Sequence, residues 1–133
     1  MNLLKMELIM NKDKNFVFPK QWEIWLVKIK KTSEDRKTFR PFLIVSDNIR
    51  NQFDNLIVAI PITTKNLENI EDFEVFIEKS SELKLDHSCK LQFFYPRTID
   101  KNLRLISCLG SVNREIIEKS KKAWKFSFDA DTW

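Results

Sequence analysis

Glycine is almost absent from this sequence, since Gly110 is the only glycine in 133 residues. Phosphate-binding loops of the P-loop and dinucleotide-binding types need several glycines at fixed spacing, because their backbone approaches the phosphate closely. Both types of loop are therefore excluded. Any contact with a phosphate group must come from side chains.

Cysteine and histidine are nearly as scarce. Cys89 and Cys108 are the only cysteines and do not have CxxC spacing, and His87 is the only histidine. This set is too small for a zinc site, a multi-histidine metal centre or a disulfide framework. We therefore expect two reduced, packed thiols in a cytoplasmic protein that uses no metal or other cofactor.

Long apolar runs are also missing. The opening stretch MNLLKMELIM is interrupted by Lys5 and Glu7, and no small-residue cleavage site follows it. Such a run is too short to cross a bilayer and does not follow the pattern of a signal peptide. We expect an N-terminal arm or short helix over residues 1–20, one domain over 21–133, and no membrane partner.

The remaining composition is that of an ordinary globular domain, with 43% hydrophobic and 32% charged residues,. The formal net charge of +4 would attract a polyanion such as a nucleic acid,. A lysine-rich, glycine-poor sequence can equally reflect a biased genome composition. Charge therefore leaves both explanations open.

Short apolar or alternating segments predict strands. NLIVAIPIT, for example, is a continuous apolar run with Pro61 near its end, where a missing backbone donor is tolerated,. About six such segments with short connections are typical of a small, strongly curved antiparallel barrel. The segments cover residues 22–30, 41–47, 55–63, 73–78, 87–96 and 103–110.

One amphipathic helix is predicted after the last strand. Ser111 suits the N-cap position, and Val112, Ile116, Ser120 and Ala123 then share one face,. Lysines near the end of this stretch suit the negative end of the helix dipole. The fold is therefore expected to be mainly β with a C-terminal helix, an α+β class.

Polar side chains stand at the ends of the predicted buried strands. Arg40 precedes the strand at 41–47, and Thr63 and Thr64 stand at the end of the next apolar run, at 55–63. An arginine can bind a phosphate with two hydrogen bonds or stabilise the added charge of a pentacovalent phosphate, and a threonine hydroxyl can donate to the same oxygens. The alternative is that Arg40 is a solvated residue at the edge of a strand and that Thr63 and Thr64 form an ordinary turn.

The order of the motifs is itself informative. EIWLV, a polar loop containing SE, RPFLIVSDNIRN, LIVAIPITT and RTIDKNLRLISCLGSV follow one another before the amphipathic helix. Over about residues 21–125 this order resembles the MazF/PemK family of toxin endoribonucleases. The resemblance implies an SH3-like barrel and a homodimer. It also implies sequence-selective, metal-independent cleavage of single-stranded RNA and a cognate antitoxin protein as partner.

The resemblance also implies roles for individual residues. Arg40 matches the family's catalytic arginine and Thr63 its catalytic threonine, while Glu34 matches the acidic residue of the Ser-Glu loop, with a catalytic or gating role. Arg97 lies in the segment whose family counterpart is near the RNA groove. One departure is Trp22, which stands where the family usually has a glycine.

For RNA binding we expect cationic side chains around the first loop and aromatic side chains that stack bases. The expected reaction is attack by the RNA 2′-hydroxyl on the adjacent phosphate, which needs positioning and charge stabilisation but no metal. Glu34 is chemically an easier general base than Arg40, and His87 is another candidate. The expected RNA-binding residues are Lys28, Lys30, Arg36, Lys37, Thr64, Tyr95 and Arg97.

Two other functions remain open from the sequence. The chain could be a non-catalytic member of the fold that binds RNA or an antitoxin, because its first loop lacks the family's glycines. It could also be a related toxin that acts on DNA gyrase, although the Arg-Pro and Pro-Ile-Thr segments favour the nuclease.

Overall fold

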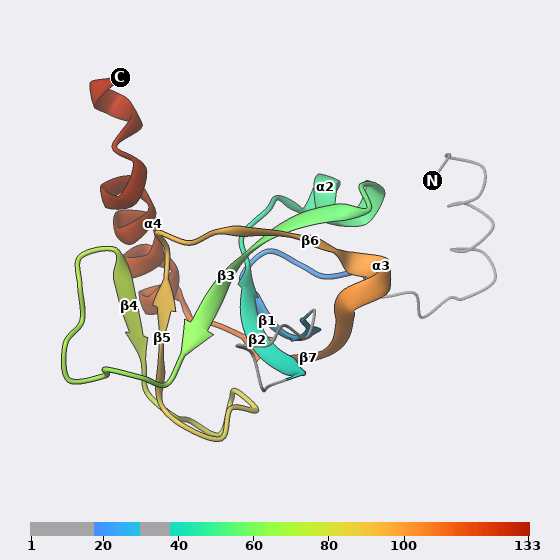
Figure 1. Ribbon diagram of the computed structural model, residues 1–133, viewed down its shortest axis with the longest axis horizontal. Helices are drawn as coiled ribbons and strands as arrows, with labels where there is room; N and C mark the ends of the chain where they lie inside the picture. The colour runs from blue at the N-terminus through green and yellow to red at the C-terminus, as the bar shows by residue number, and fades with distance from the viewer. Residues whose placement is uncertain (1–17, 30–37) are drawn as a thin grey trace.

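The computed structural model describes residues 18–29 and 38–133 (Figure 1). Most of the expected N-terminal arm lies outside the described residues. Within the described part, seven strands form one antiparallel sheet. The strands are β1 (Glu23–Lys28), β2 (Phe39–Ile44), β3 (Leu56–Thr63), β4 (Glu74–Ile77), β5 (Cys89–Gln92), β6 (Arg97–Asp100) and β7 (Leu105–Ser111).

The sheet is curved and roughly barrel-like, but it is not closed. The strand order is β4-β5-β3-β2-β1-β7, and β6 pairs with β3 outside this path. β3 connects two parts of the sheet, because its first half, Leu56 to Ala59, pairs with β6 while Ile62 and Thr63 pair with β5 (Figure 1). The predicted fold, mainly β with a C-terminal helix, is confirmed.

The prediction of one strand over residues 87–96 is wrong in its extent. β5 ends at Gln92, and a turn follows in which the Tyr95 amide donates to the Gln92 carbonyl at 3.2 Å. Pro96, which has no backbone N–H, comes next,. The chain then starts β6, a strand that the sequence analysis did not predict.

Two short helices, α2 (Asn48–Phe53) and α3 (Lys101–Arg104), were not predicted either. Each begins directly after an aspartate N-cap, Asp47 or Asp100, whose side chain accepts backbone N–H bonds,. α3 occupies the start of the strand predicted at 103–110, so β7 begins only at Leu105. A one-residue cap and four to six helical residues give too little periodicity to be recognised in sequence.

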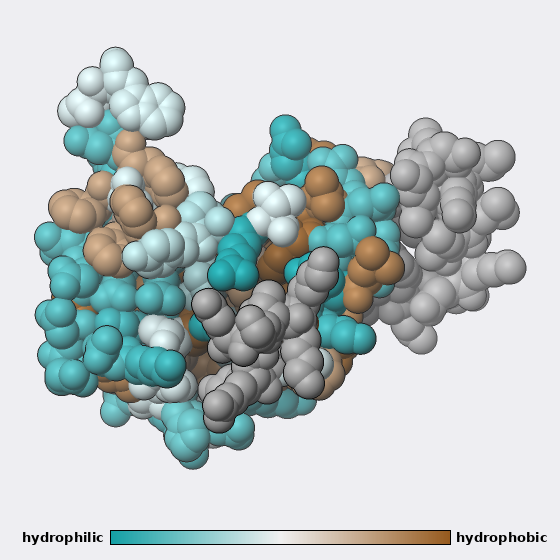
Figure 2. All heavy atoms as spheres, in the orientation of Figure 1, coloured by the Kyte–Doolittle hydropathy of each residue, from teal (hydrophilic) through white to brown (hydrophobic). Residues whose placement is uncertain are grey.

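The predicted C-terminal helix is present as α4 (Arg114–Phe128), and a 3-10 turn, η1 (Ala130–Thr132), follows it. Its N-cap is Asn113, whose side chain accepts from the Ile116 amide, and not Ser111, which ends β7. α4 packs beside β4, and its far end extends beyond the sheet (Figure 1). Apolar side chains lie on the surface around it (Figure 2). Phe126 of α4 is an exposed apolar residue. None of the helices in the described ranges has the length and apolar content that a membrane crossing requires.

Both faces of the central strands are buried. On one face Ile24, Leu43 and Ile60 belong to a core that also includes Ala123 of α4. On the other face Phe42 and neighbouring apolar residues of β1, β3 and β6 form a second cluster. Since side chains alternate along a strand, this double burial explains why β2 and β3 read as continuous apolar runs.

Trp22 adopts a left-handed backbone conformation, with φ of 74°. Its amide donates to the Ile44 carbonyl at 2.8 Å, and its carbonyl accepts from the Val112 amide at 3.0 Å. The ring packs against the first core cluster. A positive φ is the conformation that favours glycine, so a tryptophan here carries backbone strain, which the partial burial of its ring against the core offsets,.

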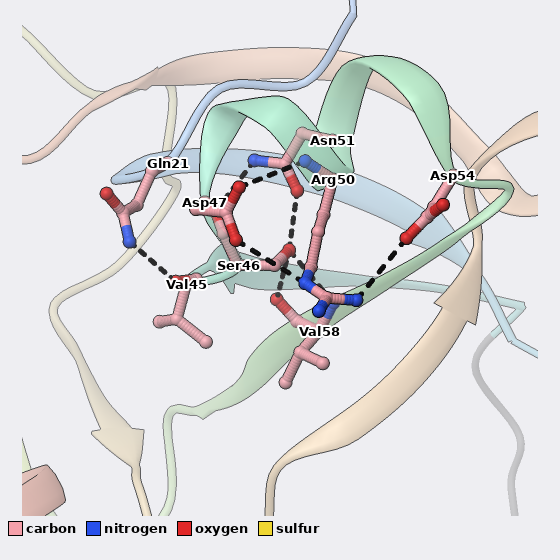
Figure 3. A network of polar contacts seen from close by, with 8 residues as sticks. All are labelled: Gln21, Val45, Ser46, Asp47, Arg50, Asn51, Asp54 and Val58. Atoms are coloured by element: carbon pink, nitrogen blue, oxygen red, sulfur yellow. Dashed lines mark hydrogen bonds and ion pairs between the residues drawn. The ribbon is translucent and has the colours of Figure 1, made fainter.

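The polar residues of the SDNIRN segment fix the end of β2 to the middle of β3 (Figure 3). Asn51 is fully buried; its amide group donates to the Ser46 carbonyl at 2.8 Å and its oxygen accepts from the Ser46 hydroxyl at 2.5 Å. The Ser46 hydroxyl in turn accepts from the Val58 amide at 3.0 Å. This motif is therefore structural: it holds the two strands that carry Arg40 and Thr63 in one register.

Candidate functional site

Arg40 and Thr63 lie on the neighbouring strands β2 and β3, close to one end of their pairing. The β2–β3 ladder ends with Phe42 opposite Pro61; Arg40 and Thr63 each lie two residues beyond this pair, so strand alternation puts both on the face of Phe42 and Pro61,. The Arg40 guanidinium also donates from Nη2 to the Ile62 carbonyl at 3.4 Å. The guanidinium is thus held beside the strand end that carries the threonine.

The hydrogen bonds of Thr63 leave its hydroxyl able to act as a donor. Its Oγ1 accepts from the Lys65 amide at 3.2 Å, as in a turn in which a hydroxyl bonds the backbone two residues on,. A hydroxyl that accepts in this way can still donate its own hydrogen to a ligand oxygen. Thr64 follows directly and is exposed.

An arginine and a threonine hydroxyl together make a site for a negatively charged oxygen group. The guanidinium is planar and offers several N–H donors in a fixed arrangement that matches a phosphate, and Thr63 adds a neutral donor. Both residues are half-buried, which weakens competition from water,. Neither group is a proton acceptor at neutral pH, so a general base has to come from another residue.

Several predicted site residues lie in the first loop. Lys30, Glu34, Arg36 and Lys37 lie outside the described residues, so their expected roles stay predictions. Lys28 is described and exposed at the end of β1, where it pairs with Phe39. Because the neighbouring pair is Val27 with Arg40, strand alternation places Lys28 and Arg40 on opposite faces of the sheet,.

Tyr95 and Arg97 lie further along the sheet. Tyr95 is 52% exposed and its ring centroid is 5.5 Å from that of Phe94 and 6.4 Å from that of Phe73. Arg97 is exposed at the start of β6, opposite Ala59, and thus four strand positions from Thr63, roughly 13 Å along β3,. Arg97 therefore lies along β3 from Thr63, on the strand face that Ala59 and Thr63 share,.

One buried charged pair next to this site was not predicted from the sequence. Lys90 of β5 lies opposite Thr63 of β3, and its Nζ is 2.9 Å from a Glu74 carboxylate oxygen. The only sequence signal is a lysine inside the short apolar strand around Leu91, which is also what a solvated strand face would show.

Neither cysteine is a reactive group, and the described residues hold no metal cluster. Burial raises the pKa of the Cys89 thiol to about 11, and desolvation raises the pKa of the Cys108 thiol as well, so neither is an activated nucleophile,. Both thiols are free. Over residues 18–29 and 38–133, no three His, Cys, Asp or Glu side chains are grouped so that they could hold a metal ion.

The fold is that of a known class of small toxins. A mycobacterial endoribonuclease, solved in complex with its cognate antitoxin, has 21% identity and a TM-score of 0.69, over 84% of this chain and 96% of that one. The Mycobacterium tuberculosis toxin MazF-mt6 has 19% identity and a TM-score of 0.66, over 80% of this chain and 96% of that one. A MazE–MazF structure from Deinococcus radiodurans has 17% identity and a TM-score of 0.61, over 84% of this chain and 95% of that one.

The sequence identifies the family. A model described as PemK-like, MazF-like toxin of type II toxin-antitoxin system matches residues 20–128, so the chain belongs to this family of toxins. A comparison with curated protein sequences gives no match. The family resemblance predicted from the motifs is therefore confirmed.

Proposed function

We propose that this toxin is an endoribonuclease that cuts single-stranded RNA, including messenger RNA, at a preferred short sequence and without a metal ion. The observation that supports this most directly is the hydrogen bond from the Arg40 guanidinium to the carbonyl of Ile62, the residue before Thr63, beside the Phe42–Pro61 pair of β2 and β3. Two donors of this kind are suited to a phosphate that gains negative charge during reaction.

The proposed reaction is an internal transfer within the RNA. The 2′-oxygen forms a bond to phosphorus while the bond to the 5′-oxygen breaks, which leaves a 2′,3′-cyclic phosphate and a 5′-hydroxyl. Arg40 binds the phosphate oxygens as their charge rises, and Thr63 donates its hydroxyl to the same group. A base removes the 2′-hydroxyl proton and the leaving oxygen gains one; Glu34 is our candidate for the base, with His87, exposed before β5, as the alternative,.

The surroundings supply candidate contacts for the rest of the RNA. Arg97 can bind a phosphate, and Tyr95 with Phe94 can stack a base, since both rings are about half exposed,. Lys28, Lys30, Arg36, Lys37 and Thr64 remain further candidates. We also propose that the toxin works in the cytoplasm as a homodimer and is neutralised by a cognate antitoxin protein.

The test is cleavage of a long, unstructured RNA in the presence of EDTA, with both new ends mapped. We expect cuts at one repeated short motif, with Arg40→Ala slower by about 10²–10³-fold, the usual effect of removing a donor that stabilises a developing charge. Thr63→Val should also be slower than the wild type, whereas Thr132→Val, at an exposed threonine near the C-terminus, should not. Arg114→Ala, an exposed change of equal charge on α4, should cut like the wild type.

Other outcomes would identify a different function. RNA binding without cleavage by folded protein would favour the non-catalytic binding module. DNA breaks that require gyrase, with no RNA cleavage, would favour a gyrase-directed toxin. Cleavage that is unchanged in Arg40→Ala would contradict the proposed site while leaving the nuclease in place.

A further inference from the structure

A buried ion pair lies one strand away from the candidate site. Lys90 of β5 and Glu74 of β4 are joined at 2.9 Å, and their side chains are only 5% and 3% exposed. The pairing of Phe76 with Lys90 and of Glu74 with Gln92 places the two charged residues diagonally on one face,. Such a pair is costly to desolvate, so its other contacts decide what it contributes.

Those other contacts all belong to the loop that connects β3 to β4, residues 64–73. The Lys90 ammonium also donates to the Asn66 and Asn69 carbonyls, each at 2.9 Å, so its three hydrogens have three acceptors. The Glu74 carboxylate accepts from the Glu71 amide at 3.0 Å. One ammonium group thus holds the middle of the loop, and its partner holds the end.

The same lysine lies opposite the threonine of the candidate site. Thr63 pairs directly with Lys90 across the β3–β5 ladder, and the loop held by Lys90 begins at the next residue, Thr64. The Lys65 amide, which donates to the Thr63 hydroxyl, is part of this loop. The direction of that hydroxyl therefore depends on a loop conformation that Lys90 fixes.

We propose that Lys90, with Glu74, is a positioning residue for the reaction: it fixes loop 64–73 so that the Thr63 hydroxyl and Thr64 are presented beside Arg40. This inference rests on the proposed ribonuclease function. The alternative is that the pair only stabilises the sheet. An apolar pair of similar volume can replace a buried ion pair without loss of stability, but it cannot bond the Asn66 and Asn69 carbonyls.

Replacing the ion pair by an apolar pair therefore separates its effect on stability from its effect on the loop. Lys90→Met alone leaves a buried, unpaired carboxylate and should strongly destabilise the protein, whereas Lys90→Met/Glu74→Leu should recover most of the lost urea midpoint, falling short of the wild type by the lost bonds to the Asn66 and Asn69 carbonyls,. Lys79→Met, an exposed lysine just after β4, is the control. All variants are compared by urea unfolding, by kcat and KM for RNA cleavage, and by amide exchange at Lys65 and Asn69.

We expect the double variant to regain most of the stability that Lys90→Met loses and yet to have kcat at least tenfold lower and faster exchange at Lys65. Recovery of kcat together with stability would overturn the proposal, because it would show a purely structural pair. If the wild type cuts no RNA, the proposed function fails separately. Exchange at Lys65 and the backbone NMR shifts of Thr63 then still decide whether Lys90 fixes the loop.

Discussion

The fully buried side chain of Asn51 provides the sharpest test of how the sheet is held together. Asn51→Ala removes the donor to the Ser46 carbonyl and the acceptor of the Ser46 hydroxyl (Figure 3). The carbonyl is left without its donor, which costs about 1–3 kcal/mol, and the weakened hydroxyl costs about 1 kcal/mol more. The hydroxyl keeps the Val58 amide and has the Val58 carbonyl at 3.4 Å, which limits the second loss.

We therefore expect Asn51→Ala to lower the free energy of unfolding by about 3 kcal/mol, a large part of the stability of an ordinary domain. The assay is urea unfolding followed by tryptophan fluorescence, with the midpoint shifted and the slope unchanged. Asn102→Ala is the control, because it removes an exposed amide bond to Asn55 and should cost well under half as much. Equal, small losses of unfolding free energy in both variants would refute the assignment of the Asn51 side chain as the group that fixes β2 to β3.

Two further predictions concern a glycine and a thiol. Gly110→Ala should cost about 2 kcal/mol or more in thermal unfolding, because φ is +127° and the new Cβ would lie 2.8 Å from the Glu82 carbonyl oxygen,; an unchanged melting temperature would contradict this. Since burial raises the pKa of Cys89 from 9.0 to about 11, the folded protein keeps a proton that the unfolded chain loses. The free energy of unfolding should therefore fall between pH 9 and 11, by at most about 1.4 kcal/mol per pH unit. Urea unfolding at several pH values should show a smaller fall in Cys89→Ala; an equal pH dependence in both proteins would contradict the assignment to Cys89.

The sequence predicted the parts of this fold that depend on local pattern and chain order. Apolar runs located β2 and β3, and because consecutive antiparallel strands usually pair, Arg40 and Thr63 could be expected near each other. The split of residues 87–96 into β5 and β6 could not be read from composition. It depends on which half of β3 each piece pairs with, a long-range choice.

The candidate site was predictable only where its residues belong to recognisable motifs. Arg40 comes directly before Pro41 and Thr63 two residues after Pro61, next to apolar runs in which a polar residue is conspicuous. Lys90 is hidden, since a lysine in a strand usually points to solvent, and only the positions of Asn66, Asn69 and Glu74 show that this one is buried. Trp22 is the reverse case: its left-handed backbone would have been predicted from a glycine.

The pairing of β1 with β7 has a consequence for when the toxin becomes active during its synthesis. β1 ends at Lys28, but one of its two partner strands is made only when the ribosome reaches Leu105–Ser111. Strand pairs so distant in sequence form slowly, because a long loop must close before any contact compensates the lost entropy. A growing chain that already carries Arg40 and Thr63 is thus still an incomplete sheet. The sheet cannot be completed until a further 48 residues, from Thr63 to Ser111, have been translated, which delays folding of the toxin by that interval.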